Sequence, residues 1–145
     1  MILVHGTAID IGGQGVLLRG PSGAGKSDLA LRLIEAGARL VSDDQTRLSR
    51  DGEGPVMMTA PETIAGLIEV RGLGLLRMVV CDASPLRLLI DLVPPDQVER
   101  MPPPETESIL GHPIPRLRLH PWEASAQTKV RLAVGVATGG IMALR

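Results

Sequence analysis

Aromatic residues are almost absent from this sequence. Among its 145 residues there is one tryptophan, Trp122, and no phenylalanine or tyrosine. Proteins that bind single-stranded nucleic acid stack the bases on aromatic side chains, so this scarcity argues against that class of function. A stacked adenine pocket of the usual kind also has only Trp122 available. The formal net charge of −1 adds no broad basic surface for nucleic acid or membrane.

Cysteine and long apolar runs are scarce as well. The single cysteine, Cys81, has no partner for an internal disulfide, and its apolar neighbours are typical of a small buried side chain. The longest uncharged stretch, residues 132–144, contains three glycines and is too short for a membrane-spanning helix. Residues 1–4 lead directly into His5 and Gly6 without a signal-peptide pattern. We therefore expect a cytoplasmic protein that binds neither membranes nor nucleic acid.

One glycine-rich stretch carries the clearest chemical signal. It fits the phosphate-binding pattern G-x-x-x-x-G-K-[ST] at every fixed position, through Gly20, Pro21, Ser22, Gly23, Ala24, Gly25, Lys26 and Ser27. Glycines in such a loop let successive backbone N–H groups point at phosphate oxygens. Lys26 would reach the β- and γ-phosphates, and the Ser27 hydroxyl would bind the Mg²⁺ that bridges them. Only two of the 15 basic residues are lysines, and one stands where the motif requires it.

The residues on both sides agree with a phosphate-binding loop (P-loop). Two apolar runs, residues 7–11 and 16–19, flank Gly12-Gly13-Gln14-Gly15, which predicts a β-hairpin leading into the loop. Residues 27–36 repeat apolar side chains at helical spacing and stop before Gly37, which predicts a helix leaving it. The N-terminus of that helix would add partial positive charge beneath the phosphates.

Acidic residues follow the next predicted strand. Asp43 and Asp44 come directly after the apolar residues 39–41. Behind a P-loop, one such carboxylate can hold Mg²⁺ and the other can accept a proton from an attacking hydroxyl, although Ser-Asp-Asp also suits a turn or a helix cap. Further on, Glu69 and Arg71 alternate with apolar residues, a pattern that fits either a ligand site or an edge strand with one face in water.

The rest of the chain predicts more strands than helices. Strands are expected at residues 56–58, 77–81, 86–93 and 115–119, a short helix start at 60–66, a stiff connector at 101–105, and a C-terminal helix from Glu123 through the last apolar run. About seven strands with two or three helices, in a mostly non-alternating order, indicate an α+β fold. The length and the lack of a linker predict one domain over residues 1–145.

Four segments together resemble a known family, the C-terminal catalytic domain of bacterial HPr kinase/phosphorylase. They are His5-Gly6, the P-loop, Val41-Ser42-Asp43-Asp44, and residues 68–74, whose sequence Ile-Glu-Val-Arg-Gly-Leu-Gly is similar to the family's own signature. The resemblance implies a P-loop kinase domain similar to phosphoenolpyruvate carboxykinase, with a mostly antiparallel or mixed sheet, a P-loop helix and a C-terminal helix. It also implies a kinase that uses ATP, or pyrophosphate, to phosphorylate a serine of an HPr-type phosphocarrier protein, and that can remove the phosphate by phosphorolysis.

The same resemblance implies roles for individual residues. It implies catalytic roles for His5, Lys26, Asp44 and Arg100, and Mg²⁺ binding by Ser27, Asp43 and Glu69. Asp44 would accept the proton of the substrate serine, His5 would lie beside the reacting phosphate, and Arg100 would offset charge during transfer. Members of the family are typically hexamers, so a homo-oligomer is implied too.

The chain departs from the family in two places. The family's separate N-terminal domain is absent from this sequence, and residues 121–125, Pro-Trp-Glu-Ala-Ser, stand in place of a Pro-Gly-Arg-Asn type loop. A short form of this kind resembles those of alphaproteobacteria, in which the carrier belongs to a nitrogen-related phosphotransfer system. Because Glu123 would repel inorganic phosphate where the family supplies an arginine and an asparagine, we expect a weakened phosphorylase activity.

Two other functions are compatible with the residues alone. A P-loop kinase acting on a nucleotide or small metabolite would use the same loop, although the sequence shows no obvious arginine-rich lid segment. A non-catalytic ATP-sensing module would also bind nucleotide, but it would have no need of a proton acceptor such as Asp44.

Overall fold

The structure is a computed structural model that describes residues 1–144. These residues form eleven strands, two α-helices and two short 3-10 helices. In chain order they are β1 (Ile2–His5), β2 (Thr7–Ile11), β3 (Gln14–Arg19), α1 (Lys26–Glu35), β4 (Arg39–Ser42), β5 (Gln45–Arg50), β6 (Val56–Thr59), η1 (Glu62–Ile64), β7 (Leu67–Val70), β8 (Gly74–Arg77), β9 (Ser84–Leu92), η2 (Pro95–Gln97), β10 (Glu105–Ile109), β11 (His112–Leu119) and α2 (Ala126–Ala137).

The long strand β9 joins the sheet together. It pairs in parallel with β3 and with β11, while its first residues pair antiparallel with β6. Nine strands form one mixed sheet in the order β1-β5-β6-β9-β3-β2-β4, and β11 and β10 branch from β9. Strands β7 and β8 form a separate antiparallel hairpin. The mixed, mostly antiparallel sheet with a P-loop helix and a C-terminal helix confirms the predicted α+β class.

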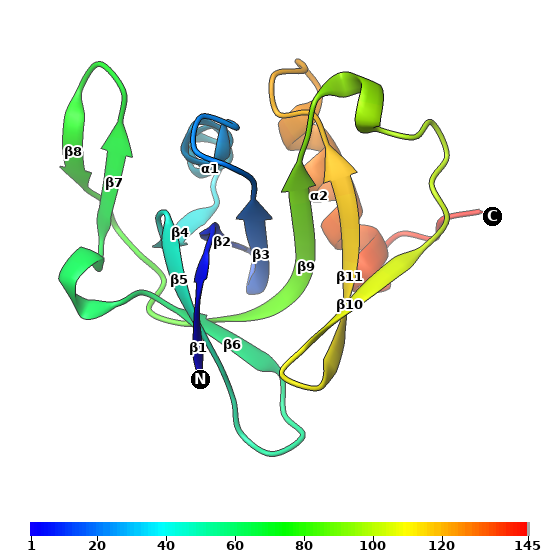
Figure 1. Ribbon diagram of the computed structural model, residues 1–145, viewed down its shortest axis with the longest axis horizontal. Coiled ribbons are helices and arrows are strands. Elements are labelled where there is room, and N and C mark those ends of the chain that lie inside the picture. Colours follow the sequence, from blue (N-terminus) through cyan, green and yellow to red (C-terminus); the bar gives the residue numbers. More distant parts are fainter. Residues whose placement is uncertain (145) are drawn as a thin grey trace.

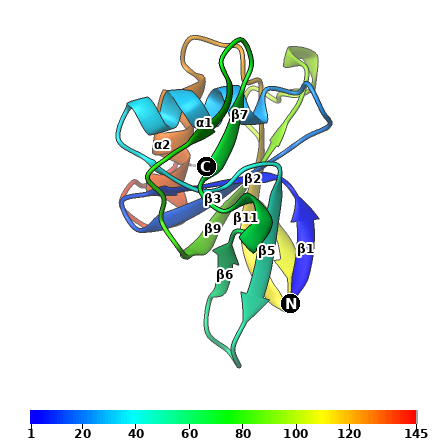
Figure 2. The ribbon, with the colours of Figure 1, turned by 90° about the vertical axis from the view of Figure 1, so that its left-hand side faces the viewer.

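Both faces of the central strands are buried. Helices α1 and α2 lie on one side of β2, β3 and β9, and strands β1, β5 and β6 lie on the other (Figures 1 and 2). Since neighbouring side chains of a strand point to opposite faces, Val16 and Leu18 of β3 join the core beneath the helices, whereas Leu17 packs against Leu48 and Met58. The P-loop therefore leaves a strand that is fixed from both sides.

Several predicted elements are confirmed close to their predicted bounds. The hairpin before the P-loop is β2 paired antiparallel with β3, and the helix after it is α1. Strands β4, β6 and β11 cover the runs predicted at residues 39–41, 56–58 and 115–119, and β9 covers the run predicted at 86–93 except for its last residue. The segment with alternating Glu69 and Arg71 folds as the β7–β8 hairpin.

Two predicted elements were wrong in extent. The strand predicted at residues 77–81 does not form, because β8 ends at Arg77 and the chain then makes only an isolated bridge from Val80 to Leu40. The C-terminal helix starts at Ala126 rather than Glu123 and stops at Ala137. Gly139 follows it with a φ of +83°, a conformation that suits glycine and ends a helix.

Strands β1, β5 and β10 were not predicted. The sequences of β5 (QTRLSR) and β10 (ETESI) are largely polar, so they carry little apolar signal. They form because the neighbouring strands supply ladder hydrogen bonds and charge partners, as Arg118 of β11 does for Glu105 of β10. Within residues 1–144 no helix is long and apolar enough to cross a membrane.

Candidate active site

The loop between β3 and α1 is shaped by glycine. Gly23 and Gly25 have φ values of +82° and +98°, in the left-handed region that glycine adopts without strain. Gly25 is also crowded, since a Cβ atom there would lie 2.9 Å from Trp122 Cζ2 and 3.1 Å from Pro121 Cγ. The loop thus needs glycine at position 25 both for its backbone conformation and for its close packing.

Lys26 lies folded over this loop. Its Nζ donates hydrogen bonds to the carbonyl oxygens of Gly20, at 2.6 Å, and Pro21, at 3.0 Å. Burial lowers the pKa of the ammonium group, and the nearby charges of Asp44 and Asp43 act against that shift. These hydrogen-bond partners are neutral carbonyls, so the charge of Lys26 is available to an anionic ligand at the loop.

Asp43 is buried and accepts hydrogen bonds from three parts of the chain. Its Oδ1 accepts from the hydroxyls of Ser27, at 2.7 Å, and Thr7, at 3.0 Å, and its Oδ2 accepts from the backbone N–H of Glu69, at 3.2 Å. Neutral donors from α1, β2 and β7 therefore hold this carboxylate directly behind the first turn of α1.

Asp44 has a different environment, because its side chain is exposed. Its backbone has a φ of +66°, which aspartate and asparagine tolerate better than most residues. The turn is fixed by hydrogen bonds from the N–H of Gly6 to the Asp44 carbonyl, at 2.8 Å, and from the N–H of Asp44 to Thr7 Oγ1, at 3.2 Å. His5 Nε2 lies 2.8 Å from Asp44 Oδ1, so the last residue of β1 contacts the carboxylate.

Several of these groups line a cleft of about 670 Å³. It lies between α1 and the β7–β8 hairpin, whose places in the fold are seen in Figure 1. That volume lies within the range of small-molecule sites. Its walls come from the P-loop, the outer side of α1, the hairpin, and two single residues. The lining residues are Ser22, Gly23, Gly25, Lys26, Ser27, Asp28, Leu31, Asp44, Glu69, Val70, Arg71, Gly72, Gly74 and Trp122.

The cleft gathers most of the residues predicted from the sequence. Lys26, Ser27, Asp44 and Glu69 line it, Asp43 is hydrogen-bonded to Ser27 behind it, and His5 contacts Asp44. Arg100 does not join them. It is exposed on the segment between η2 and β10 and is not among the cleft-lining residues.

The oxygen atoms around Ser27 fit a magnesium–nucleotide complex. The Ser27 hydroxyl and the carboxylates of Asp43 and Glu69 are hard oxygen ligands of the kind that Mg²⁺ prefers. Within residues 1–144 no three His, Cys, Asp or Glu side chains cluster closely enough to form a complete metal site. Mg²⁺ needs no such cluster when substrate phosphates and waters supply its remaining ligands. The residues therefore suit a metal that arrives with phosphate.

A P-loop at the start of α1, with its lysine bonded to neutral carbonyls and with two acidic residues beside it, has the arrangement of the phosphate-binding site of P-loop proteins. The chain belongs to the HPr serine kinase family, since residues 1–130 match the family model described as "HPr Serine kinase C-terminal domain".

Comparisons with individual proteins agree with this membership. The chain is 42% identical over 127 residues to HPr kinase/phosphorylase of Bordetella pertussis, covering 80% of this chain and 41% of that protein. It is 47% identical over 76 residues to HPr kinase/phosphorylase of a Geobacillus species, covering 52% of this chain and 24% of that protein. The chain thus spans about two fifths of the length of the first of these relatives.

A solved structure is similar over almost the whole fold. The structure described as "Hpr(Ser) kinase/phosphatase from Coxiella burnetii" superimposes with a TM-score of 0.83 at 27% sequence identity, covering 97% of this chain and 94% of that chain.

Trp122 is the cleft residue whose position the sequence pattern did not predict. It directly precedes the residue at which we expected the C-terminal helix to begin, and in the structure it lies before α2 and is 57% exposed at the cleft wall. The signal that could have singled out Trp122 is that it is the only aromatic residue of the sequence. A nucleotide site that needs an aromatic contact for its base has no other side chain to use.

Proposed function

We propose that this chain is the catalytic domain of an ATP-dependent protein serine kinase that phosphorylates a serine of an HPr-type phosphocarrier protein. The observation that carries the proposal is the exposed Asp44 carboxylate at the edge of the cleft that contains Lys26 and Ser27. Membership in the HPr serine kinase family supports the substrate class, and it does not favour a nucleotide kinase or a non-catalytic sensor.

The P-loop side of the cleft would hold the phosphoryl donor. Backbone N–H groups of residues 20–26 would bind the phosphates, and Lys26 would exchange the Gly20 and Pro21 carbonyls for phosphate oxygens. Ser27 and Glu69 would bind Mg²⁺, with Asp43 supporting Ser27 through its 2.7 Å hydrogen bond. A Mg²⁺ ion held by these residues would neutralise part of the phosphate charge.

Asp44 would act on the substrate serine. As the serine Oγ forms its bond to the γ-phosphorus and the bond to the β-phosphate oxygen breaks, the Asp44 carboxylate would accept the hydroxyl proton. The 2.8 Å contact with His5 supports a positioning role for that histidine, since it would fix the orientation of Oδ1. Arg100 lies outside this cleft, so a role for it in charge stabilisation requires a bound partner that brings it near.

Phosphorolysis would be the weaker activity. Glu123, which replaces part of the family's Pro-Gly-Arg-Asn type loop, pairs with Lys129 at 2.8 Å. That ion pair reduces the repulsion that Glu123 exerts on inorganic phosphate. It also occupies Lys129, the cation that would otherwise serve as an extra donor to the attacking phosphate.

We further propose that the protein is a homo-oligomer, with a hexamer as the expected state. Met1 exposes 80% of its surface, and Ile2 and Leu3 of the adjoining β1 expose 41% and 56%, at the end of the sheet path, which supports burial against another copy. Light scattering at the working concentration should give an oligomeric mass. A monomeric mass would exclude this assembly.

Phosphopeptide mass spectrometry tests the kinase proposal directly. The protein would be incubated with an HPr-type carrier, Mg²⁺ and ATP, and one carrier serine should gain a phosphate. A parallel incubation with nucleoside monophosphates should give no turnover. Turnover of a monophosphate without any carrier phosphoserine would instead identify a small-molecule kinase, and nucleotide binding without either product would identify a sensor.

A further inference from the structure

The only tryptophan, Trp122, lines the part of the cleft next to the phosphate-binding loop. Lys26 and Ser27 mark the phosphate end, at the first turn of α1. Asp28, Leu31 and Trp122 form the wall beyond them, on the outer side of the helix. When the phosphates of a nucleotide lie on the P-loop, its ribose and base must bind nearby. The wall formed by Asp28, Leu31 and Trp122 is the adjoining part of the same cleft.

The indole ring is held in place before any ligand arrives. Its edge packs on the P-loop, since Gly25 leaves room for Trp122 Cζ2 that a Cβ atom would remove. The Arg32 guanidinium lies over the ring, 5.9 Å from its centroid, and covers one face. Arg32 is itself fixed, because it donates to Asp28 Oδ2, at 3.0 Å, and to the carbonyl of Pro121.

One face of the ring is nonetheless open. Trp122 keeps 57% of its surface exposed although Arg32 covers one face and the P-loop touches its edge. A fixed aromatic ring with a free face is a suitable stacking surface, because little conformational entropy is lost when a second flat group binds. Stacking on such a surface accepts any base, since every base has a π-face.

We propose that Trp122 is the stacking platform for the base of the bound nucleoside triphosphate. This inference rests on the proposed function in one respect, the binding of ATP in this cleft. A site of this kind would favour purines over smaller bases, because purines offer a larger stacking surface. It would not distinguish adenine from guanine by hydrogen bonds to the base edge. Stacking on Trp122 also gives residues 121–125, which depart from the family's loop, a binding role specific to this chain.

Fluorescence of the wild-type protein gives the first test, because Trp122 is its only tryptophan and the chain has no tyrosine. Mg²⁺-ATP and Mg²⁺-GTP should both change the emission of Trp122. Mg²⁺-pyrophosphate should bind, as calorimetry would report, and yet change the emission much less, since it has no base. An equal change with pyrophosphate would overturn the proposal.

Two variants separate stacking from packing. Trp122→Leu keeps an apolar side chain against Gly25 but has no aromatic face, and it should raise the Kd for ATP by about 5- to 100-fold. Trp122→Phe keeps a π-face and should stay within about threefold of the wild type. Both variants should bind pyrophosphate with a Kd within about twofold of the wild-type value, because the phosphate contacts are unchanged.

Three results would contradict the inference. An unchanged ATP affinity in Trp122→Leu would show that the ring does not touch the base. An equal loss of ATP and pyrophosphate binding would assign Trp122 to the support of the P-loop. An unchanged ATP affinity with a raised KM for the carrier would assign it to protein docking. The fluorescence and the Kd values for ATP and pyrophosphate can be measured without a carrier, so these tests do not depend on whether the carrier serine becomes phosphorylated.

Discussion

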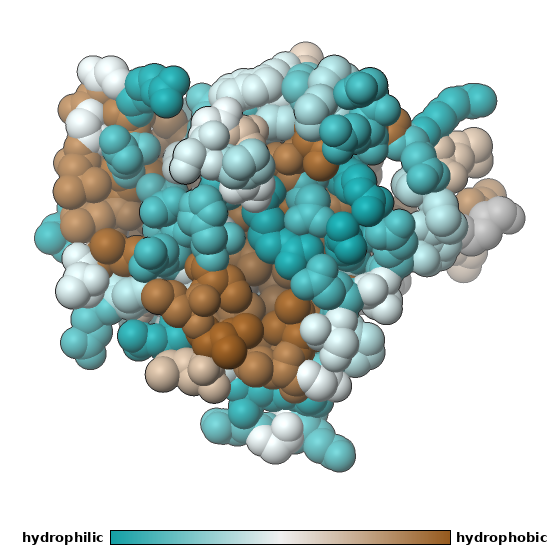
Figure 3. All heavy atoms as spheres, viewed as in Figure 1, coloured by the Kyte–Doolittle hydropathy of each residue, from teal (hydrophilic) through white to brown (hydrophobic). Residues whose placement is uncertain are grey.

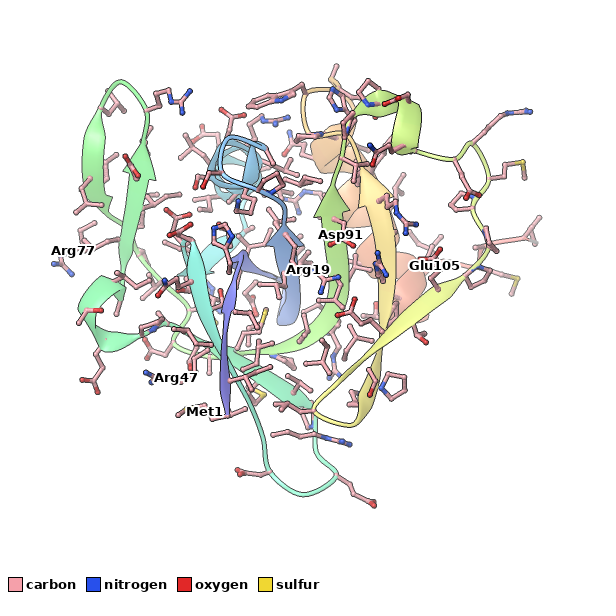
Figure 4. The ribbon with its side chains drawn as sticks, in the orientation of Figure 1. Met1, Arg19, Arg47, Arg77, Asp91 and Glu105 are labelled. Atoms are coloured by element: carbon pink, nitrogen blue, oxygen red, sulfur yellow. The ribbon has the colours of Figure 1, made fainter. Side chains whose placement is uncertain are left out.

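Two clusters of charged residues lie at the end of β3, and they are built in opposite ways. Arg19, the last residue of the strand, belongs to a quartet with Asp91, Glu107 and Arg116. It donates to Asp91 Oδ1 and to both Glu107 oxygens at 2.8 Å, while Arg116 donates to Asp91 Oδ2 at 2.7 Å. Figure 4 shows Arg19 and Asp91 facing each other from neighbouring strands, and Figure 3 shows hydrophilic side chains gathered over that part of the sheet.

In the quartet each charged side chain is paired directly with one of opposite charge, whereas Lys26 and Asp43 of the cleft are hydrogen-bonded to neutral groups. Hydrogen bonds from Arg19 lower the pKa of Glu107, and the hydrogen bond to Glu107 raises the pKa of Arg19 despite its partial burial. In the cleft, Lys26 bonds to carbonyls and Asp43 to neutral donors. Lys26 and Asp43 carry opposite charges but make no direct ion pair with each other, and such half-compensated buried charges point to a charged ligand. Pairing of charges thus distinguishes a structural cluster from a site.

The largest expected effect is on catalysis. Asp44→Asn should retain ATP binding but reduce the rate of carrier phosphorylation by about 10²- to 10⁴-fold, the usual cost of removing a general base. Asparagine also accepts the φ of +66°, so the turn should survive. Single-turnover kinetics with phosphorylated carrier as the readout would measure this. A rate near that of the wild type would show that another group accepts the proton.

The second prediction concerns the reverse direction. With excess inorganic phosphate, release of pyrophosphate from phosphorylated carrier should be on the order of tenfold or more slower than the forward kinase reaction, because a donor for the attacking phosphate is engaged elsewhere. Lys129 is engaged in this way by its ion pair with Glu123. Glu123→Gln should free Lys129 and speed phosphorolysis more than the kinase reaction. Equal forward and reverse rates in the wild type would refute this explanation.

The third prediction concerns stability in the quartet. Glu107→Gln should lower the free energy of unfolding by about 1 kcal/mol at pH 7, with partial solvent exposure limiting the loss, and should leave kinase activity unchanged. Because folding lowers the pKa of Glu107, its stabilisation is present above its ordinary value of 4.5 and is lost as the pH falls below that value. Urea unfolding at several pH values should show the variant and the wild type converging in acid. A constant difference down to low pH would show that the Glu107 charge is not the cause.

The smallest expected effect is on nucleotide choice. Phosphate contacts dominate in the cleft and stacking is tolerant of base identity, so the Kd values for ATP and GTP should agree to within about threefold. Calorimetry with both nucleotides would measure the difference. A strong preference for ATP would reveal hydrogen bonds to the adenine edge, made by backbone groups near Trp122.

Local patterns predicted the part of the site that is local. The P-loop and α1 follow from one motif and one helical repeat, so residues 20–36 could be predicted nearly to the residue. Asp43, Asp44 and Glu69 could be named, but not their separate environments. The burial of Asp43 depends on Thr7, and Thr7 comes from a strand 36 residues away.

The elements that could not be predicted depend on distant partners. Strand β10 is polar because its glutamates meet arginines of β3 and β11, and such pairing leaves no apolar periodicity to detect. The place of Trp122 is set by contacts with Gly25 and Arg32, far away in the chain. The same reasoning applies to Arg100. Resemblance to a family suggested a catalytic role for it, but only the tertiary structure shows that it does not line the cleft.

The packing of Pro121 and Trp122 on Gly25 has a consequence for how the protein matures. Strand β3 and helix α1 can form early from neighbouring residues, but the side of the P-loop at Gly25 is completed only when a segment about 95 residues later reaches it. Contacts across such a separation form late, because a long loop must close first. During synthesis the N-terminal part of the chain emerges first. A nascent chain that has not yet released residues 121–122 would carry the whole motif and still lack a finished nucleotide site.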